Sequence, residues 1–169
     1  KIKCLVRIDS EISHLKKLDL NLNFIYSDLD DINFLKETFR GVKTVLHVAG
    51  ILFSEEIIRL GILADVRWFV CVHTTGRYSN FKSASQEYIR IEDSLLKKHP
   101  NLTILRPTMI YGSSSDQNLW KLINYMDKYN FFPVFGRGRN LMQPVNAKDL
   151  GDAYFDVLKH KKNTFGKQY

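Results

Sequence analysis

Short apolar runs alternate along this chain with longer segments in which apolar residues recur every three or four positions. Apolar runs bounded by turn residues are typical of buried strands, and the three-to-four spacing is typical of helices. The runs predict strands at 2–6, 24–26, 42–48, 67–72 and 102–106. The spacing predicts helices at 31–39, 55–64, 83–98, 119–129 and 148–160, a weak helix or loop at 12–22, a short extended piece at 131–134 and a loop at 136–140.

This alternation of strands and helices predicts an α/β fold with a mostly parallel sheet covered by helices on both faces. The stretch 67–112 shows it best, because a strand, a crossover helix and a second strand follow one another there. Open α/β sheets place their chemistry where such strands end, so the polar residues at those ends are the first candidates for a site. Local signals agree with the pattern, since Asp30 or Asp31 would cap the helix at 31–39 and Gly41 follows its end.

Length, composition and charge narrow the classes of partner. A chain of 169 residues with 44% hydrophobic content has the size and composition of one globular domain. Its formal charge is +7, but the charges are scattered, so we expect no nucleic-acid partner and favour a phosphate-bearing small molecule. No run is long enough for a membrane span and no signal peptide is recognisable, which predicts no membrane partner and a cytoplasmic location. Cys4 and Cys71 lie inside apolar runs and are expected to be buried and reduced.

Motifs at the predicted strand ends resemble the short-chain dehydrogenase/reductase superfamily, in its extended and atypical epimerase-like branch. The motifs, in the family's order, are CLVR at 4–7, SDLDD at 27–31, VLHVAG at 45–50, HTTG at 73–76, ILRPTMIYG at 104–112 and QPVNAKDLGDA at 143–153. The resemblance implies a Rossmann-like, doubly wound NAD(P)-binding domain over 1–169, partial in extent.

The resemblance also implies a cofactor, NADP or NAD, and residues that bind it. Arg7 stands where a guanidinium would pair with the 2′-phosphate of NADP, although a solvated arginine at a strand end is an equal interpretation. Asp28 and Leu29 resemble the pair that brackets the adenine ring. Ala49 and Gly50 match small residues that let the protein backbone approach the cofactor. The segment that runs past the nicotinamide amide is matched by Pro107, Thr108 and Ile110.

The family's first strand and its glycine-rich turn have no counterpart in this sequence. In the doubly wound order the missing strand lies in the middle of the sheet, so the strands at 2–6 and 42–48 would flank a gap. We favour the interpretation that these residues are the middle of a longer protein. A partner chain that supplies the strand, or direct pairing of the two flanking strands, are the alternatives. Residues 165–169 resemble the beginning of a further strand.

Catalysis in the family uses a Tyr-x-x-x-Lys pair on the helix after the fourth strand of this chain, with a Ser or Thr at the preceding strand end. Thr74 or Thr75 fits the last role, but Tyr88 is followed four residues later by Glu92 instead of lysine. In a second register, which we favour, Glu92 matches a glutamate that packs the same helix, Tyr88 takes the lysine position and Ala84 the tyrosine position. The lysine is absent in both registers, and Lys82 could reach in from the loop.

Other polar candidates have simpler interpretations. His73 lies at a strand end beside the site, where a structural or solvent-bound histidine is favoured over an acid/base. His47 is expected to be a packed strand histidine. Arg137 resembles a loop arginine that binds a nucleotide-sugar diphosphate in epimerase-like relatives, although a solvated turn is favoured. Asp149 is expected to cap a helix or to face its dipole. The sequence has no metal-ligand spacing.

The leading hypothesis is therefore an NAD(P)-dependent oxidoreductase or epimerase/dehydratase-like protein that acts on a nucleotide-sugar or another small carbonyl or hydroxyl substrate. A non-catalytic dinucleotide-binding module, serving as a redox sensor or assembly subunit, is the alternative, and a remnant that binds nothing is a third. The expected partner is a small-molecule substrate, and a homo-oligomer is left open.

Overall fold

The computed structural model describes residues 1–169 except 81, 113–115, 117–118, 133, 135 and 140, and also leaves out the side chains of 82–84. The strands are β1 (Ile2–Val6), β2 (Leu22–Tyr26), β3 (Thr44–His47), β4 (Trp68–Val72), β5 (Thr103–Leu105), β6 (Ile110–Tyr111) and β7 (Val145–Asn146). The helices are α1 (Ser13–Lys16), α2 (Ile32–Thr38), α3 (Ser54–Leu63), α4 (Lys82–Lys98), α5 (Leu119–Tyr129), α6 (Ala147–Lys159) and α7 (Lys161–Thr164), with 3-10 turns η1 (Ile51–Phe53) and η2 (Thr75–Tyr78).

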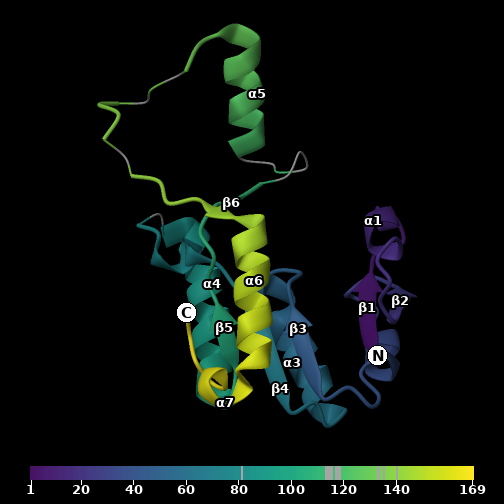
Figure 1. The fold of residues 1–169 in the computed structure, drawn as a ribbon. Coiled ribbons are helices and arrows are strands. Elements are labelled where there is room, and N and C mark those ends of the chain that lie inside the picture. The colour runs from purple at the N-terminus through teal and green to yellow at the C-terminus, as the bar shows by residue number, and fades with distance from the viewer. Residues whose placement is uncertain (81, 113–115, 117–118, 133, 135, 140) are drawn as a thin grey trace.

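All the strand pairs are parallel, and they form separate ladders: β1 with β2, β3 with β4 and β5, and β6 with β7. In the described part of the chain β1 and β3 do not pair with each other, and Figure 1 shows the β1–β2 pair standing apart from β3–β5. The gap expected between the strands at 2–6 and 42–48 is therefore present, and the alternative of direct pairing is wrong for this structure.

The last residues of the chain extend the three-stranded ladder. The backbone N–H of Ile104 donates to the carbonyl of Lys167 at 3.0 Å, and the N–H of Tyr169 donates to the carbonyl of Ile104 at 2.9 Å. The bridge between Ile104 and Gln168 is parallel. Residues 167–169 thus lie beside β5 in the direction of a further strand, as their sequence suggested.

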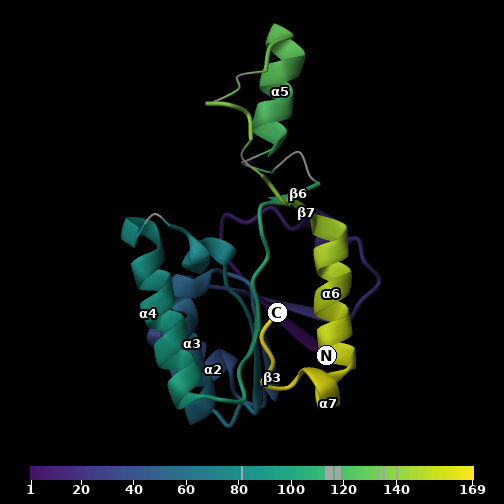
Figure 2. The ribbon, with the colours of Figure 1, turned by 90° about the vertical axis from the view of Figure 1, so that its left-hand side faces the viewer.

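Strand β4 is the centre of the core because all five of its residues are buried. Its side chains alternate between the two faces of the sheet, so Phe69 and Cys71 join one apolar cluster while Trp68 and Val70 join another. The first cluster draws on α3 and α4, and the second draws on α6 through Val157. Figure 2 shows α3 and α4 on one side of the sheet and α6 on the other, which confirms the predicted layering.

Cap residues explain where two helices begin. The carboxylate of Asp31 accepts the N–H of Phe34 at 3.1 Å, so Asp31 caps α2 as one of the two predicted choices. At α6 the cap is Asn146, whose side chain accepts the N–H of Lys148 at 2.8 Å, and Asp149 lies in the first turn beside the positive end of the helix dipole.

Some expectations need correction. The segment predicted as a weak helix or loop at 12–22 forms the short helix α1 followed by a loop, but strand β2 begins at Leu22, two residues earlier than predicted. Cys4 is half-buried and not buried, since β1 lies at the outer part of the fold, whereas Cys71 is buried and both thiols are free. Residues 131 and 132 are in no strand, and the rest of the predicted extended piece and loop falls partly outside the described residues.

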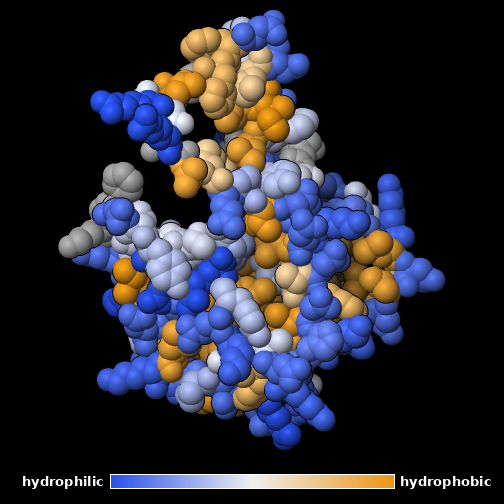
Figure 3. All heavy atoms as spheres, turned by 60° about the vertical axis from the view of Figure 1, so that its left-hand side comes forward, coloured by the Kyte–Doolittle hydropathy of each residue, from blue (hydrophilic) through white to orange (hydrophobic). Residues whose placement is uncertain are grey.

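Helix α5 projects from the body of the fold (Figures 1 and 2) and buries none of its residues. Figure 3 shows apolar side chains gathered on this projection above the more polar body. No helix of the described residues is long and apolar enough to cross a membrane.

A glycine in α3 gives a direct test of how closely α3 packs on β4. A Cβ at Gly61 would lie 2.6 Å from two ring atoms of Phe69, whereas a Cβ at Gly151 in α6 would meet nothing within 4 Å. We expect Gly61→Ala to lower the free energy of unfolding by about 1–3 kcal/mol through overpacking. Gly151→Ala should raise it by up to about 1 kcal/mol through helix propensity. Urea denaturation of both variants measures this, and equal effects of the two would contradict the packing.

Candidate functional site

A pocket of about 250 Å³ lies where β3 and β4 end, and α4 closes its side. Its lining consists of Ala49, Gly50, residues 51–53, His73, Thr74 and Tyr88. Gly50 has φ of +103°, a backbone conformation that glycine adopts without strain, and it leads β3 into the η1 turn. The structure therefore brings together four of the predicted site residues, from three different segments of the chain, at the carboxyl edge of a parallel sheet.

Thr74 and Thr75 have different surroundings. The hydroxyl oxygen of Thr74 accepts the N–H of Gly76 at 3.0 Å, which leaves its O–H available to donate into the pocket that Thr74 lines. The hydroxyl of Thr75 instead donates to the carbonyl of Pro107 at 3.4 Å and ties the end of β4 to the segment after β5. Of the two predicted candidates, Thr74 has the position that suits a ligand.

Tyr88 reaches the same pocket from α4. Its ring lies close to the η2 turn, since a Cβ at Gly76 would be 3.4 Å from Tyr88 Cδ2. A Cβ there would also lie 3.2 Å from Thr74 Oγ1, so the turn is tight around Thr74. Tyr88 and Thr74 thus line one cavity, and this location agrees with either register considered for Tyr88.

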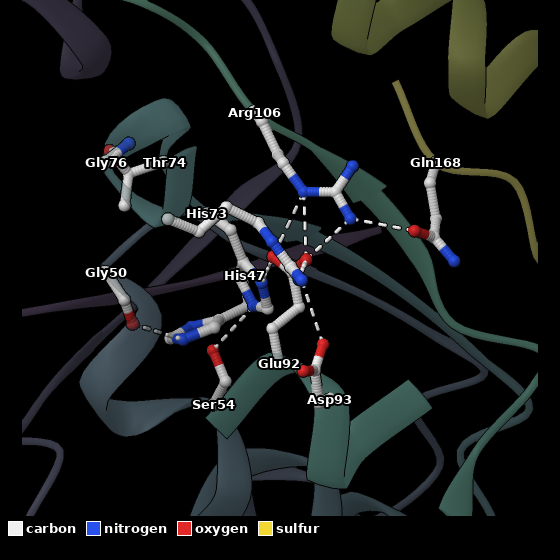
Figure 4. A network of polar contacts seen from close by, with 11 residues as sticks. His47, Gly50, Ser54, His73, Thr74, Gly76, Glu92, Asp93, Arg106 and Gln168 are labelled. Atoms are coloured by element: carbon white, nitrogen blue, oxygen red, sulfur yellow. Dashed lines mark hydrogen bonds and ion pairs between the residues drawn. The ribbon is translucent and has the colours of Figure 1, made fainter. Parts of the chain in front are cut away.

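One helical turn beyond Tyr88, the carboxylate of Glu92 is fully buried and is the centre of a polar network (Figure 4). Arg106 donates to it through Nη2 at 2.6 Å and through Nε at 2.9 Å. His73 Nδ1 lies 2.8 Å from the other oxygen, and Arg77 Nη1 donates from the η2 turn. Two guanidinium groups therefore balance its charge, a packing role of the kind that the second register assigns to Glu92.

The network continues to its neighbours. Arg77 Nη2 also donates to Asp93 at 2.9 Å, and Arg106 Nη2 donates to Gln168 at 2.8 Å. Arg77 Nε is a buried polar atom for which the described residues supply no partner. Burial by itself raises the pKa of Glu92, but the hydrogen bonds from His73 and Arg106 outweigh it and lower this pKa to about 2.

Both ring nitrogens of His73 are already occupied. An ionised carboxylate only accepts, so Nδ1 carries a proton and donates to Glu92. Nε2 lies 3.1 Å from the hydroxyl of Ser54, at the start of α3, and the His73 side chain has no exposed surface. This arrangement suits a structural histidine, the role favoured from the sequence. His47 is buried too, with Nε2 3.0 Å from the carbonyl of Gly50, and burial lowers its pKa to about 4.

Other predicted cofactor residues lie outside the lining of this pocket. Arg7 follows β1 with its side chain 70% exposed, and its guanidinium is 3.5 Å from Asp9. Asp28 follows β2 and is exposed, whereas Leu29 packs against the larger apolar cluster. All of them still occupy carboxyl ends of strands, where the family resemblance places them.

The segment after β5 and the projecting part carry the remaining candidates. Pro107 and Thr108 are half-buried directly after β5, and Ile110 is in β6, where it pairs with Val145. Arg137 is exposed in the loop beyond α5. None of these residues lines the pocket described above.

The sequence pattern did not point to two partners of Glu92, nor to the pair Tyr78 and Lys82. Arg77 and Arg106 were not singled out, because no local spacing shows that they meet one carboxylate. Tyr78 stands four residues before Lys82, which is the Tyr-x-x-x-Lys spacing, but this pair precedes the helix predicted at 83–98. The Tyr78 ring is 66% exposed and lies 5.5 Å from Arg77 and 5.9 Å from Arg106, while the Lys82 side chain is outside the described residues.

Comparisons with known proteins bear on the fold. No family model matches the chain. The chain is 35% identical over 79 residues to the mitochondrial NADH dehydrogenase (ubiquinone) 1 alpha subcomplex subunit 9 of Arabidopsis thaliana, a match that covers 46% of this chain and 19% of that protein.

Two solved structures show the fold. The dTDP-glucose 4,6-dehydratase of Streptomyces venezuelae, with NAD bound, has a TM-score of 0.70 at 17% identity over 92% of this chain and 60% of that one. A short-chain dehydrogenase/reductase of Veillonella parvula, in complex with NADP, has a TM-score of 0.61 at 15% identity over 89% of this chain and 72% of that one. The chain thus spans about 60% of the dehydratase, and the likeness to both structures confirms the Rossmann-like α/β fold that the sequence predicted.

The pH dependence of the free energy of unfolding tests whether folding lowers the pKa of Glu92. Because the folded pKa is about 2 and the ordinary value is 4.5, its contribution to stability is complete above about pH 4.5 and is lost as the pH falls toward 2. We expect the free energy of unfolding of Glu92→Gln to fall less steeply across this window than that of the native chain. Urea denaturation at several pH values gives the slopes, and parallel slopes would show that folding does not lower the pKa of Glu92.

Proposed function

We propose that this chain is part of an extended short-chain dehydrogenase/reductase that binds a nicotinamide dinucleotide along the carboxyl edge of β3, β4 and β5. The observation that carries the proposal is the pocket whose lining includes Ala49, Gly50, Thr74 and Tyr88. The small residues Ala49 and Gly50 leave room for a flat ring close to the backbone, and Thr74 and Tyr88 each carry a hydroxyl group. Solved structures of the same fold hold NAD or NADP.

The proposed reaction class is oxidoreduction, epimerisation or dehydration of a small carbonyl or hydroxyl substrate, with a nucleotide-sugar as the leading candidate. A bound nicotinamide would supply or accept the hydride. The hydroxyl of Thr74 is placed to donate to the substrate oxygen, because its acceptor side is taken by the N–H of Gly76. In the first register Tyr88 exchanges the proton with that oxygen, and in the second register it does not.

The preference for NADP over NAD rests on Arg7 and on net charge. Arg7 has a largely exposed guanidinium at the end of β1, held only by a 3.5 Å ion pair with Asp9. Surface ion pairs of this kind contribute little, so the guanidinium is free to exchange Asp9 for a phosphate. The formal charge of +7 favours a phosphate-rich ligand in general.

The single-domain organisation and cytoplasmic location also stay predictions, and the compared plant protein is mitochondrial by name.

Narrowing the pocket should weaken cofactor binding. Ala49 lines the pocket, whereas Ala153 is exposed on α6 and does not. We expect Ala49→Leu to raise the dissociation constant for NADPH about tenfold, which corresponds to about 1.4 kcal/mol, and Ala153→Leu to leave it unchanged. Fluorescence titration with NADPH measures the dissociation constants of both variants. The same titration with NADH shows whether NADPH is preferred, as expected from Arg7. The titrations use the full protein of which this chain is part, and its failure to bind either cofactor would refute the proposal.

A matched pair of substitutions distinguishes the roles of the two tyrosines near the site. Tyr88 lines the pocket, and Tyr78 is exposed outside it with the Tyr-x-x-x-Lys spacing. If Tyr88 gives the proton, Tyr88→Phe should lower NADPH-dependent reduction of carbonyl compounds by about 10²–10⁴-fold, while Tyr78→Phe should not. Unchanged turnover in Tyr88→Phe would support the second register. Cofactor binding without turnover on any nucleotide-sugar or carbonyl tested would favour the non-catalytic module.

A further inference from the structure

Thr74 lies between two residues that are both held by the same carboxylate. His73, directly before it, contacts one oxygen of Glu92 through Nδ1 at 2.8 Å. Arg77, three residues after it, donates to the other oxygen. Both attachments are buried or nearly so, since the side chains of His73 and Glu92 have no exposed surface and that of Arg77 is 17% exposed. The backbone that carries Thr74 is therefore fixed on both sides by Glu92.

A second contact fixes the same turn one helical turn away. Gly76 packs against the ring of Tyr88, and a Cβ there would lie 3.4 Å from Cδ2 of that ring and 3.2 Å from Thr74 Oγ1. Tyr88 and Glu92 are four residues apart on α4 and so lie on one face of the helix. The η2 turn thus contacts α4 through Arg77, which binds Glu92 and Asp93, and lies beside Tyr88 at Gly76.

We propose that Glu92 is the positioning residue of the pocket: by holding His73 and Arg77 together it sets the direction in which the Thr74 hydroxyl faces the ligand. This inference rests on the proposed function for its role in turnover, but its geometric part does not depend on any ligand. Glu92 does not line the pocket, so it acts through Thr74 and not on a substrate. A buried carboxylate bound to several donors from different segments is a costly arrangement whose benefit is a defined geometry.

Asp93 supplies a matched control on the same helix. It also accepts from Arg77, at 2.9 Å, but its side chain is 56% exposed and it has no contact to His73 among the interactions of the described residues. Removing its charge loosens Arg77 on one side only, whereas removing the charge of Glu92 loosens both sides of Thr74. Both variants weaken the hold on Arg77, but only Glu92→Gln also loosens the links to His73 and Arg106.

The first measurement needs no ligand. We expect the amide resonances of Thr74 and Gly76 in a ¹⁵N-labelled chain to move in Glu92→Gln and to stay in place in Asp93→Asn. A folded Glu92→Gln chain with unmoved Thr74 and Gly76 resonances would overturn the proposal. If Glu92→Gln does not fold, Arg77→Met takes its place. This substitution removes only the bond between Arg77 and Glu92 on one side of Thr74, and the Arg77 side chain is partly exposed. The resonances of Thr74 and Gly76 are again the readout.

The second measurement separates positioning from simple stabilisation. For any carbonyl compound that the native chain reduces with NADPH, Thr74→Ala should lower kcat/KM about tenfold or more in the native and Asp93→Asn backgrounds. In the Glu92→Gln background the same change should cost less than about twofold, since Thr74 is already misplaced. An equal loss in all three backgrounds would overturn the positioning role. If the native chain neither binds NADPH nor reduces any compound, the proposed function fails, and the resonances alone decide the role of Glu92.

Discussion

The buried carboxylate of Glu92 is the interaction on which the candidate site depends. It joins the end of β4 through His73, the η2 turn through Arg77 and the end of β5 through Arg106, all from one position on α4. Burying an ion costs several kcal/mol unless its partners satisfy it, and here two guanidinium groups and an imidazole do so. The carboxyl edge of the three-stranded ladder and the helix that covers it are consequently held as one unit.

This arrangement changes the significance of the missing lysine. In the sequence, Glu92 stands four residues after Tyr88, where the first register expects the lysine. In the structure its charge is directed into the protein and is balanced by Arg77 and Arg106, while Tyr88 and Thr74 line the pocket. An unusual helix sequence is therefore compatible with a nicotinamide site.

Much of the fold could be predicted from the sequence, because the signals involved are local. The apolar run of β4, the cap at Asp31 and the helical spacing of α4 each reflect neighbouring residues, and each is present as predicted or nearly so. The network around Glu92 could not be predicted, since its partners come from positions up to 19 residues away and meet only after the sheet has formed. Helix α5 was predicted from its spacing, but that spacing does not say what its apolar face would contact.

The most direct test of the central claim is to map where a nicotinamide cofactor contacts this chain. In a ¹⁵N-labelled sample titrated with NADPH, we expect the resonances of Gly50, Thr74 and Tyr88 to shift first and to saturate together. A second hollow of similar size lies at the opposite end of the fold, beside Lys36 and Ala64, and provides an internal reference. Shifts confined to that hollow, or no shift at Gly50 and Thr74 at saturating NADPH, would show that the nicotinamide does not bind at the carboxyl ends of β3 and β4.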